Sequence, residues 1–120
     1  MAENIIKTKS FSFALRIVKL YQFLNQEKKE YVLSKQLLRS GTGIGALVRE
    51  AEQAESKLDF IHKLAIAQKE ANESDYWLEL LFQSDYLSQI QFQSLKTDIV
   101  EINKILASII ITTKQKIGKK

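Results

Sequence analysis

The stretch FQSLKTDIVEINKILASI, residues 92–109, repeats an apolar side chain at alternating steps of three and four residues. Because an α-helix makes one turn in 3.6 residues, this spacing places all of these side chains on one helical face. The pattern is typical of a helix that buries one face against other helices. The apolar face consists of Phe92, Leu95, Ile99, Ile102, Leu106 and Ile109.

The same spacing recurs three times upstream, and the segments between the repeats are short. Short connections place consecutive helices antiparallel. The sequence therefore predicts an all-α protein with a single domain, an antiparallel up-down-up-down four-helix bundle over residues 1–120. The expected elements are helices at about 10–23, 30–54, 57–84 and 89–113 and a basic tail at 114–120.

Polar residues at three of the expected helix starts can accept hydrogen bonds from the free backbone N–H groups of the first turn. Two of these starts pair a serine with a polar residue three positions later, which is the spacing of a capping box or of a carboxylate at the positive end of the helix dipole. The expected caps are Thr8 or Ser10, Ser56 with Asp59, and Ser88 with Gln91.

The residue types that the chain lacks exclude several classes of protein. It has no cysteine and one histidine, which excludes disulfide scaffolds, zinc fingers, thiol catalysis and a multi-histidine metal site within one subunit. The absence of proline removes the turn residues of an all-β fold. No apolar run approaches the roughly 18 residues of a membrane span, and the start has no hydrophobic signal core. We expect a cytoplasmic protein with no cofactor, no metal and no membrane contact.

Charge is distributed unevenly along the chain. Residues 1–49 carry nine basic and three acidic side chains, residues 50–101 carry four and eleven, and residues 102–120 carry five and none. The basic segments can pair with the acidic one, within a bundle or between subunits, or they can bind a polyanion. The lysine tail also complements the dipole of the last helix, which requires no ligand. The expected phosphate-binding residues are Lys7, Lys9, Arg16, Lys19, Lys114, Lys116, Lys119 and Lys120.

Three of the four glycines, Gly41, Gly43 and Gly45, fall within five residues of the second expected helix. One interpretation is a phosphate-binding loop, but the spacing matches neither glycine-rich phosphate motif and no strand precedes it. A second is a broken helix, because each interior glycine costs about 1 kcal/mol relative to alanine. The apolar spacing continues unbroken through the glycines, which favours a third interpretation, a close approach of a neighbouring helix at Gly41.

Carboxylates lie beside the apolar face of the third expected helix. Glu70 and Glu73 resemble a pair for metal binding or acid–base chemistry, but a di-iron bundle needs a Glu-x-x-His motif on two helices. His62 is the only histidine, and we expect it at the surface. No nucleophile with a positioned base is visible, so we expect no enzymatic activity. Arg39, Lys63, Glu70 and Glu73 are expected to form a partly buried ion network between the second and third helices.

The segment YWLELLF, residues 76–82, is apolar nearly all round its helix. Such a helix must be covered on every side, whereas a bundle of this size covers one side. Either a few exposed aromatic side chains are tolerated or the segment lies in a subunit interface, where aromatic residues are enriched. Surplus apolar groups elsewhere, at Phe11, Phe13, Ile110 and Ile111, favour the interface. Its candidate residues are Tyr76, Trp77, Leu80 and Phe82.

Two stretches, SKQLLRSGTGIGALVREA (34–51) and DFIHKLAIAQKEANESDYWLELL (59–81), resemble the four-helix-bundle proteins encoded in intervening sequences of bacterial 23S ribosomal RNA genes. The chain departs from the family pattern at Gly43, where the family usually has serine, and at Leu47, where it usually has asparagine. Because glycine and leucine replace polar residues there, these departures argue against a polar role for that turn of the second helix.

The resemblance implies a four-helix bundle that assembles as a homo-oligomeric ring, typically a pentamer, and a role at RNA or another nucleic acid. It supplies no catalytic residues. The first expected function is therefore that of a non-enzymatic homo-oligomer whose basic side chains contact phosphates without reading sequence. The alternative is a protein–protein adaptor or structural oligomer that makes no direct contact with nucleic acid.

Overall fold

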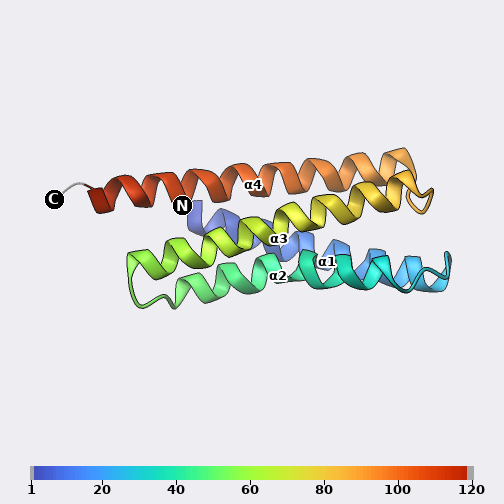
Figure 1. Ribbon diagram of the computed structural model, residues 1–120, viewed down its shortest axis with the longest axis horizontal. Helices are drawn as coiled ribbons and strands as arrows, with labels where there is room; N and C mark the ends of the chain where they lie inside the picture. Colours follow the sequence, from blue (N-terminus) through green and yellow to red (C-terminus); the bar gives the residue numbers. More distant parts are fainter. Residues whose placement is uncertain (1, 119–120) are drawn as a thin grey trace.

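The computed structural model describes the backbone of residues 2–118 and the side chains of residues 4–118, and over that range it consists of four α-helices joined by short connections. The helices lie side by side along the long axis of a particle of 55 × 22 × 20 Å (Figure 1). The predicted all-α class is confirmed. The helices are α1 (Ala2–Gln26), α2 (Leu33–Glu52), α3 (Lys57–Gln83) and α4 (Gln89–Gly118).

Each helix packs against two others. Over residues 2–118, α1 and α3 each contact both α2 and α4, and the contact between α1 and α4 is the least extensive. Figure 1 shows the α1–α2 and α3–α4 connections at one end of the particle and the α2–α3 connection at the other. The start of α1 and the end of α4 lie at this second end, and the last turns of α4 project beyond the other helices.

The apolar face predicted for α4 is buried along its whole length. It packs against the corresponding faces of α1 and α3, and belongs to one core cluster with Phe13 and Ile17 of α1 and Leu78 and Leu81 of α3. Full burial of a large apolar side chain is worth about 1.5–3 kcal/mol, so this core is the main source of stability. Within residues 2–118, no helix combines the length and the apolar character that a membrane crossing requires.

The three clustered glycines lie inside an unbroken α2. A β-carbon placed on Gly41 would lie 2.9 Å from Cγ1 of Ile17, and one on Gly45 would lie 3.5 Å from the carbonyl oxygen of Ser10. Both contacts are with α1, so the missing side chains allow α1 and α2 to approach closely. The close-packing interpretation is confirmed, and the broken-helix and phosphate-loop interpretations are wrong.

Two of the predicted caps are present. The backbone N–H of Asp59 donates to Oγ of Ser56 at 3.0 Å. Before α4, the backbone N–H of Gln91 donates to Oγ of Ser88 at 3.1 Å, and the backbone N–H of Ser88 donates to Oε1 of Gln91 at 2.9 Å. The second pair is a complete capping box, which satisfies one free N–H group at each of its two positions.

The outer ends of α1 and α4 extend beyond the expected boundaries. α1 begins at Ala2 rather than near residue 10, so Thr8 and Ser10 lie within the helix and cap nothing. Ile6 is buried in the core, which extends the apolar face of α1 upstream and holds the added turns in place. α4 continues to Gly118, so residues 114–118, expected in a basic tail beyond the last helix, are helical.

α2 begins at Leu33 rather than at residue 30 because a glutamate side chain caps it. The Glu30 carboxylate accepts hydrogen bonds from the backbone N–H groups of Val32 at 3.1 Å, Leu33 at 2.9 Å and Ser34 at 2.7 Å. Burial of this carboxyl raises its pKa, but these hydrogen bonds to the charged form outweigh burial and hold the pKa of Glu30 below its ordinary value. The sequence does not indicate this cap, because glutamate is not among the preferred N-cap residues.

Candidate functional site

Three of the four basic candidates on α1 are paired with carboxylates of neighbouring helices. All three basic side chains are about two-fifths exposed, so each pair contributes little to stability and a phosphate would compete with the carboxylate for the cation. Lys19 makes no ion pair within residues 2–118. The pairs are Lys7 with Glu52 at 3.2 Å, Lys9 with Glu101 at 3.1 Å and Arg16 with Asp98 at 2.5 Å.

The basic candidates near the carboxyl end of α4 are in a different environment. Lys114 and Lys116 are exposed on the last turns of the helix and make no ion pair with any side chain of residues 4–118. These turns project from the end of the particle at which α1 begins (Figure 1). Lys119 and Lys120 lie outside the described residues. Two of the four C-terminal candidates are therefore placed, and both are open to a ligand.

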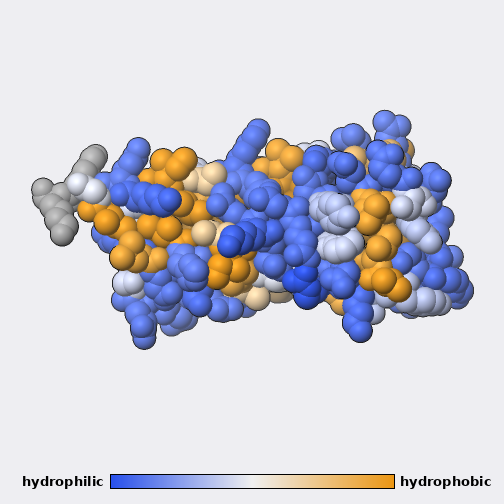
Figure 2. All heavy atoms as spheres, viewed as in Figure 1, coloured by the Kyte–Doolittle hydropathy of each residue, from blue (hydrophilic) through white to orange (hydrophobic). Residues whose placement is uncertain are grey.

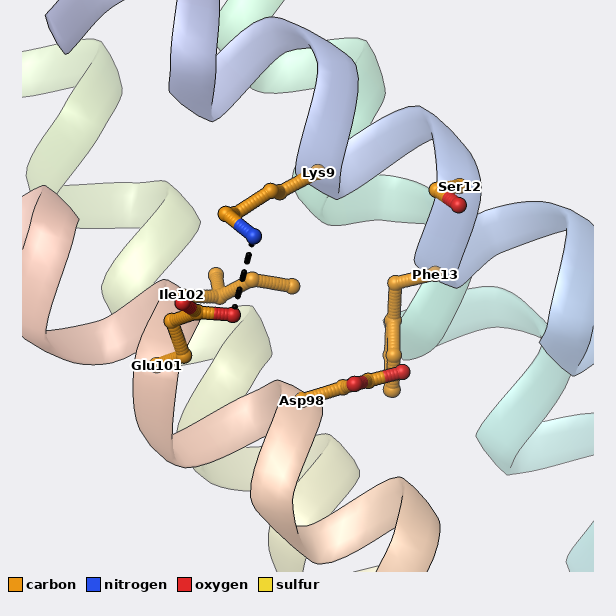
Figure 3. Close-up of a pocket in the computed structure, with 6 residues that line it drawn as sticks. All are labelled: Lys9, Ser12, Phe13, Asp98, Glu101 and Ile102. Carbon is orange, nitrogen blue, oxygen red and sulfur yellow. Dashed lines mark ion pairs between the residues drawn. The ribbon is translucent and has the colours of Figure 1, made fainter.

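A small cavity of about 90 Å³ lies between α1 and α4 (Figure 3). The Lys9–Glu101 ion pair crosses it, and the buried side chains of Phe13 and Ile102 line it. Pockets for small organic ligands usually enclose about 300–1,000 Å³, so this cavity is too small for one. Its polar lining offers no nucleophile with a base. Among the side chains of residues 4–118, no group of three or more histidine or acidic side chains is placed to hold a metal ion.

The expected ion network between α2 and α3 forms around one arginine. The Arg39 guanidinium lies 3.2 Å from Oε2 of Glu70 and is also paired with Glu73, whose Oε2 accepts the indole N–H of Trp77 at 3.0 Å. A β-carbon on Gly43 would lie 2.9 Å from Oε2 of Glu70, so the absence of a side chain there makes room for that carboxylate.

Lys63 is not part of this network, because its amine pairs with Glu50 at 3.6 Å instead. The remaining arginine–carboxylate group ties α2 to α3 at the surface. It has neither a nucleophile nor an enclosed space for a substrate, so its geometry fits a role in fixing helix register. His62, expected at the surface, is exposed.

The apolar surplus at residues 76–82 is smaller than the sequence suggests. Leu78 and Leu81 are fully buried, and the Phe82 ring stacks on Phe92 with centroids 4.5 Å apart. Trp77 is partly buried against the core, as is Phe82, and Leu80 has intermediate exposure. Of the four interface candidates, only Tyr76 projects strongly into solvent, at 59% exposure.

A larger exposed apolar surface lies on α1. Phe11, Leu15 and Val18 follow one another at steps of four and three and are 49%, 51% and 38% exposed. The guanidinium of Arg49 lies 5.1 Å from the centre of the Phe11 ring. Of these three residues, only Phe11 was expected as a surplus apolar group, because the buried face of the same helix has the same spacing. We call Phe11, Leu15 and Val18 the α1 stripe.

The other apolar residues expected to be in surplus include both buried and exposed side chains. Phe13 and Ile110 belong to the core, at 1% and 7% exposure, whereas Ile111 is 56% exposed. Figure 2 shows such apolar groups reaching the surface in separate patches among polar residues.

The chain is similar to one described protein family and to a solved structure. The model of the family described as 23S rRNA-intervening sequence protein matches residues 2–108. The chain is also similar to a crystal structure from Bacteroides thetaiotaomicron, described as a protein with unknown function from the S23 ribosomal protein family. The two chains are 60% identical and superpose with a TM-score of 0.91 over 92% of this chain and 98% of the other. No curated protein matches the chain.

Proposed function

Since the chain belongs to the 23S rRNA-intervening sequence protein family, we propose that it is a non-enzymatic homo-oligomer that binds RNA, or another nucleic acid, through basic surfaces. The name of the family associates it with ribosomal RNA genes, and the chain carries a formal net charge of +4. The observation that carries the proposal is the basic end of α4. There, Lys114 and Lys116 are exposed without an intramolecular carboxylate among the described residues.

These lysines act as phosphate contacts. Lysine–phosphate contacts position RNA without reading its bases, so binding is electrostatic and weakly selective for sequence. One subunit presents few such charges, and its affinity alone is low. A homo-oligomer repeats the basic end around its axis and gains affinity through effective concentration.

We further propose that the four helices follow an up-down-up-down order and that the subunits form a ring, typically a pentamer, in the bacterial cytoplasm. The alternating positions of the helix connections in Figure 1 support this order. Exposed apolar side chains on α1 and at Tyr76 support the association of subunits.

The test is a titration of structured ribosomal RNA with three forms of the chain at several salt concentrations. The test variant is Lys114→Gln/Lys116→Gln. The matched control is Lys35→Gln/Lys57→Gln, which removes the same charge from exposed positions on α2 and α3. We expect the parent to bind with an affinity that falls steeply with salt, and only the test variant to weaken binding and flatten the salt dependence.

Two results would contradict the proposal. One is the absence of binding at about 50 mM salt, where electrostatic binding is strong. The other is an equal loss of affinity in the test and control variants, which would assign binding to net charge rather than to the end of α4.

The second candidate function is a protein–protein adaptor or structural oligomer. The α1 stripe favours it, because three neighbouring apolar side chains on one exposed helix face are typical of a protein contact. A chain that forms a defined oligomer but binds no RNA would support this alternative.

A further inference from the structure

The α1 stripe is bordered by positive charge. Arg49 lies over the ring of Phe11, and Lys7, which is paired with Glu52, lines the same shallow groove. At the other end of the stripe, Lys19 directly follows Val18 and is exposed without an ion pair among the described residues. A partner for this face must therefore offer apolar contact together with negative charge.

The second half of α3 offers this combination. Residues 70–83 contain four acidic and no basic side chains. Glu70, Glu73 and Asp75 are paired with Arg39 or Lys96 of neighbouring helices, which leaves Glu79. Tyr76 is 59% exposed there, with its ring packed edge-on against Trp77 at 4.9 Å. Glu79, one turn further on, is exposed and makes no ion pair within residues 2–118. We call Tyr76 and Glu79, with their exposed neighbours Asn72 and Gln83, the α3 face.

The two surfaces cannot meet within one molecule. Over residues 2–118, α1 and α3 each contact α2 and α4 but not one another, so they occupy diagonal positions in the bundle. Their exposed faces therefore point away from each other. A contact between them must join two copies, and it is heterologous, because each copy uses one surface toward one neighbour and the other surface toward the next.

We propose that the α1 stripe of one copy packs against the α3 face of a second copy. This inference rests on the proposed homo-oligomer and assigns its interface. Phe11 and Leu15 bury the ring of Tyr76, and Arg49 or Lys19 pairs with Glu79. A symmetric contact between two α1 stripes would bring basic borders together, so charge favours the heterologous arrangement.

The lengths of the surfaces also agree. The exposed line that contains the α1 stripe continues from Thr8 to Gln22, and the line that contains the α3 face runs from Lys69 to Gln83. Each covers fourteen residue steps, about 21 Å at 1.5 Å per residue. Such a contact leaves the end of α4 uncovered and available for RNA.

The absence of cysteine from the chain makes disulfide cross-linking a direct test. We expect the double variant Phe11→Cys/Tyr76→Cys to form a ladder of covalent multimers under mild oxidation. Each single variant should remain at the monomer position on a denaturing gel. Dimers from Phe11→Cys alone would overturn the proposal in favour of a symmetric α1 contact, and a double variant without a ladder would overturn it outright.

Light scattering on Leu15→Asp supplies a second measurement. A buried carboxylate should raise the concentration needed for half assembly at least about tenfold. The matched control is Leu58→Asp, at a leucine of α3 that is 70% exposed outside both surfaces, and it should leave assembly unchanged. Equal behaviour of the two variants would overturn the proposal.

These outcomes separate the interface from the function on which it rests. An oligomeric parent whose double variant forms no ladder would show that the subunits associate through other surfaces. A parent with the monomer mass of 13.8 kDa would contradict both the interface and the oligomer. RNA binding is measured independently of either result.

Discussion

At the scale of single residues, the close contact between α1 and α2 depends on the missing side chain of Gly41. A β-carbon there would lie 2.9 Å from Ile17, which is fully buried and has no room to move aside. We expect Gly41→Leu to lower the free energy of unfolding by about 1–3 kcal/mol, measured by thermal or urea unfolding.

Gly45→Ala is the matched control for that substitution. Its β-carbon would meet Ser10 at 3.5 Å, an ordinary van der Waals distance. Alanine has the higher helix propensity, so this variant should be more stable than the parent by up to about 1 kcal/mol. A Gly41→Leu variant as stable as the parent would show that the α1–α2 contact is loose.

Glu30 makes stability depend on pH. Its carboxylate caps α2, so Glu30→Gln should lower the free energy of unfolding by about 1–2 kcal/mol at pH 7. Because the pKa of Glu30 in the folded chain lies below the ordinary value of 4.5, its contribution is fully present above that pH. This contribution to stability is lost as the pH falls below 4.5 and through the lower pKa that Glu30 has in the folded chain.

The measurement is urea unfolding of the parent and of Glu30→Gln at pH 7 and pH 3. The difference between the two proteins should shrink in acid, because the parent loses the charged cap and the variant has none to lose. A difference that stays constant with pH would show that the charge of Glu30 does not act in the cap.

At the scale of elements, α3 ends in a Schellman motif. The backbone N–H of Tyr86 donates to the carbonyl of Leu81 at 2.9 Å, and that of Asp85 donates to the carbonyl of Phe82 at 3.1 Å. Asp85 has a φ of 68°, the left-handed conformation in which glycine is preferred. The motif turns the chain towards α4.

Asp85→Gly should therefore raise the free energy of unfolding by about 0.5–1 kcal/mol, because it removes the cost of a β-carbon in this conformation. The neighbouring Ser84→Gly, at a φ of −91°, should instead lower it, because it only adds freedom to the unfolded chain. Paired thermal unfolding measurements decide the matter. Stabilisation by both glycines, or by neither, would contradict this account of the turn.

The four helices and most of the core could be predicted because the spacing of apolar residues repeats over several turns of each helix. The caps at Ser56 and Ser88 were also predictable, since each depends on residues three positions apart. The start of α2 was not, because Glu30 acts through a turn geometry that its sequence position does not indicate.

The candidate surfaces were harder to predict than the fold. On α1, the exposed residue Val18 and the buried Ile17 are adjacent and chemically alike, so only the packed structure separates them. The Phe82 ring is covered by Phe92, a contact across the α3–α4 connection. The spacing of apolar residues within α3 does not indicate that a side chain of α4 covers Phe82.

At the scale of the whole molecule, stability resides in the apolar core rather than in charge pairs. The ion pairs are partly exposed, and the Debye length is only about 3 Å at 1 M salt. We expect 1 M sodium chloride to change the free energy of unfolding by less than about 2 kcal/mol. Leu106→Ala, in the fully buried core, should lower it by about 2–5 kcal/mol. A larger effect of salt than of Leu106→Ala, in urea unfolding, would reverse this assignment.

The order in which the helices touch also determines how the chain folds. The extensive contacts all join helices that are consecutive in sequence, and only the sparse α1–α4 contact closes a long loop. Such local topologies fold within microseconds to milliseconds, and without proline there is no prolyl isomerisation to add a slow phase. Stopped-flow refolding of the subunit should be a single fast phase whose rate does not depend on protein concentration, separate from the concentration-dependent assembly of subunits. Core substitutions between α2 and α3 should slow it, whereas Arg16→Ala, at the α1–α4 contact that forms last, should mainly speed unfolding.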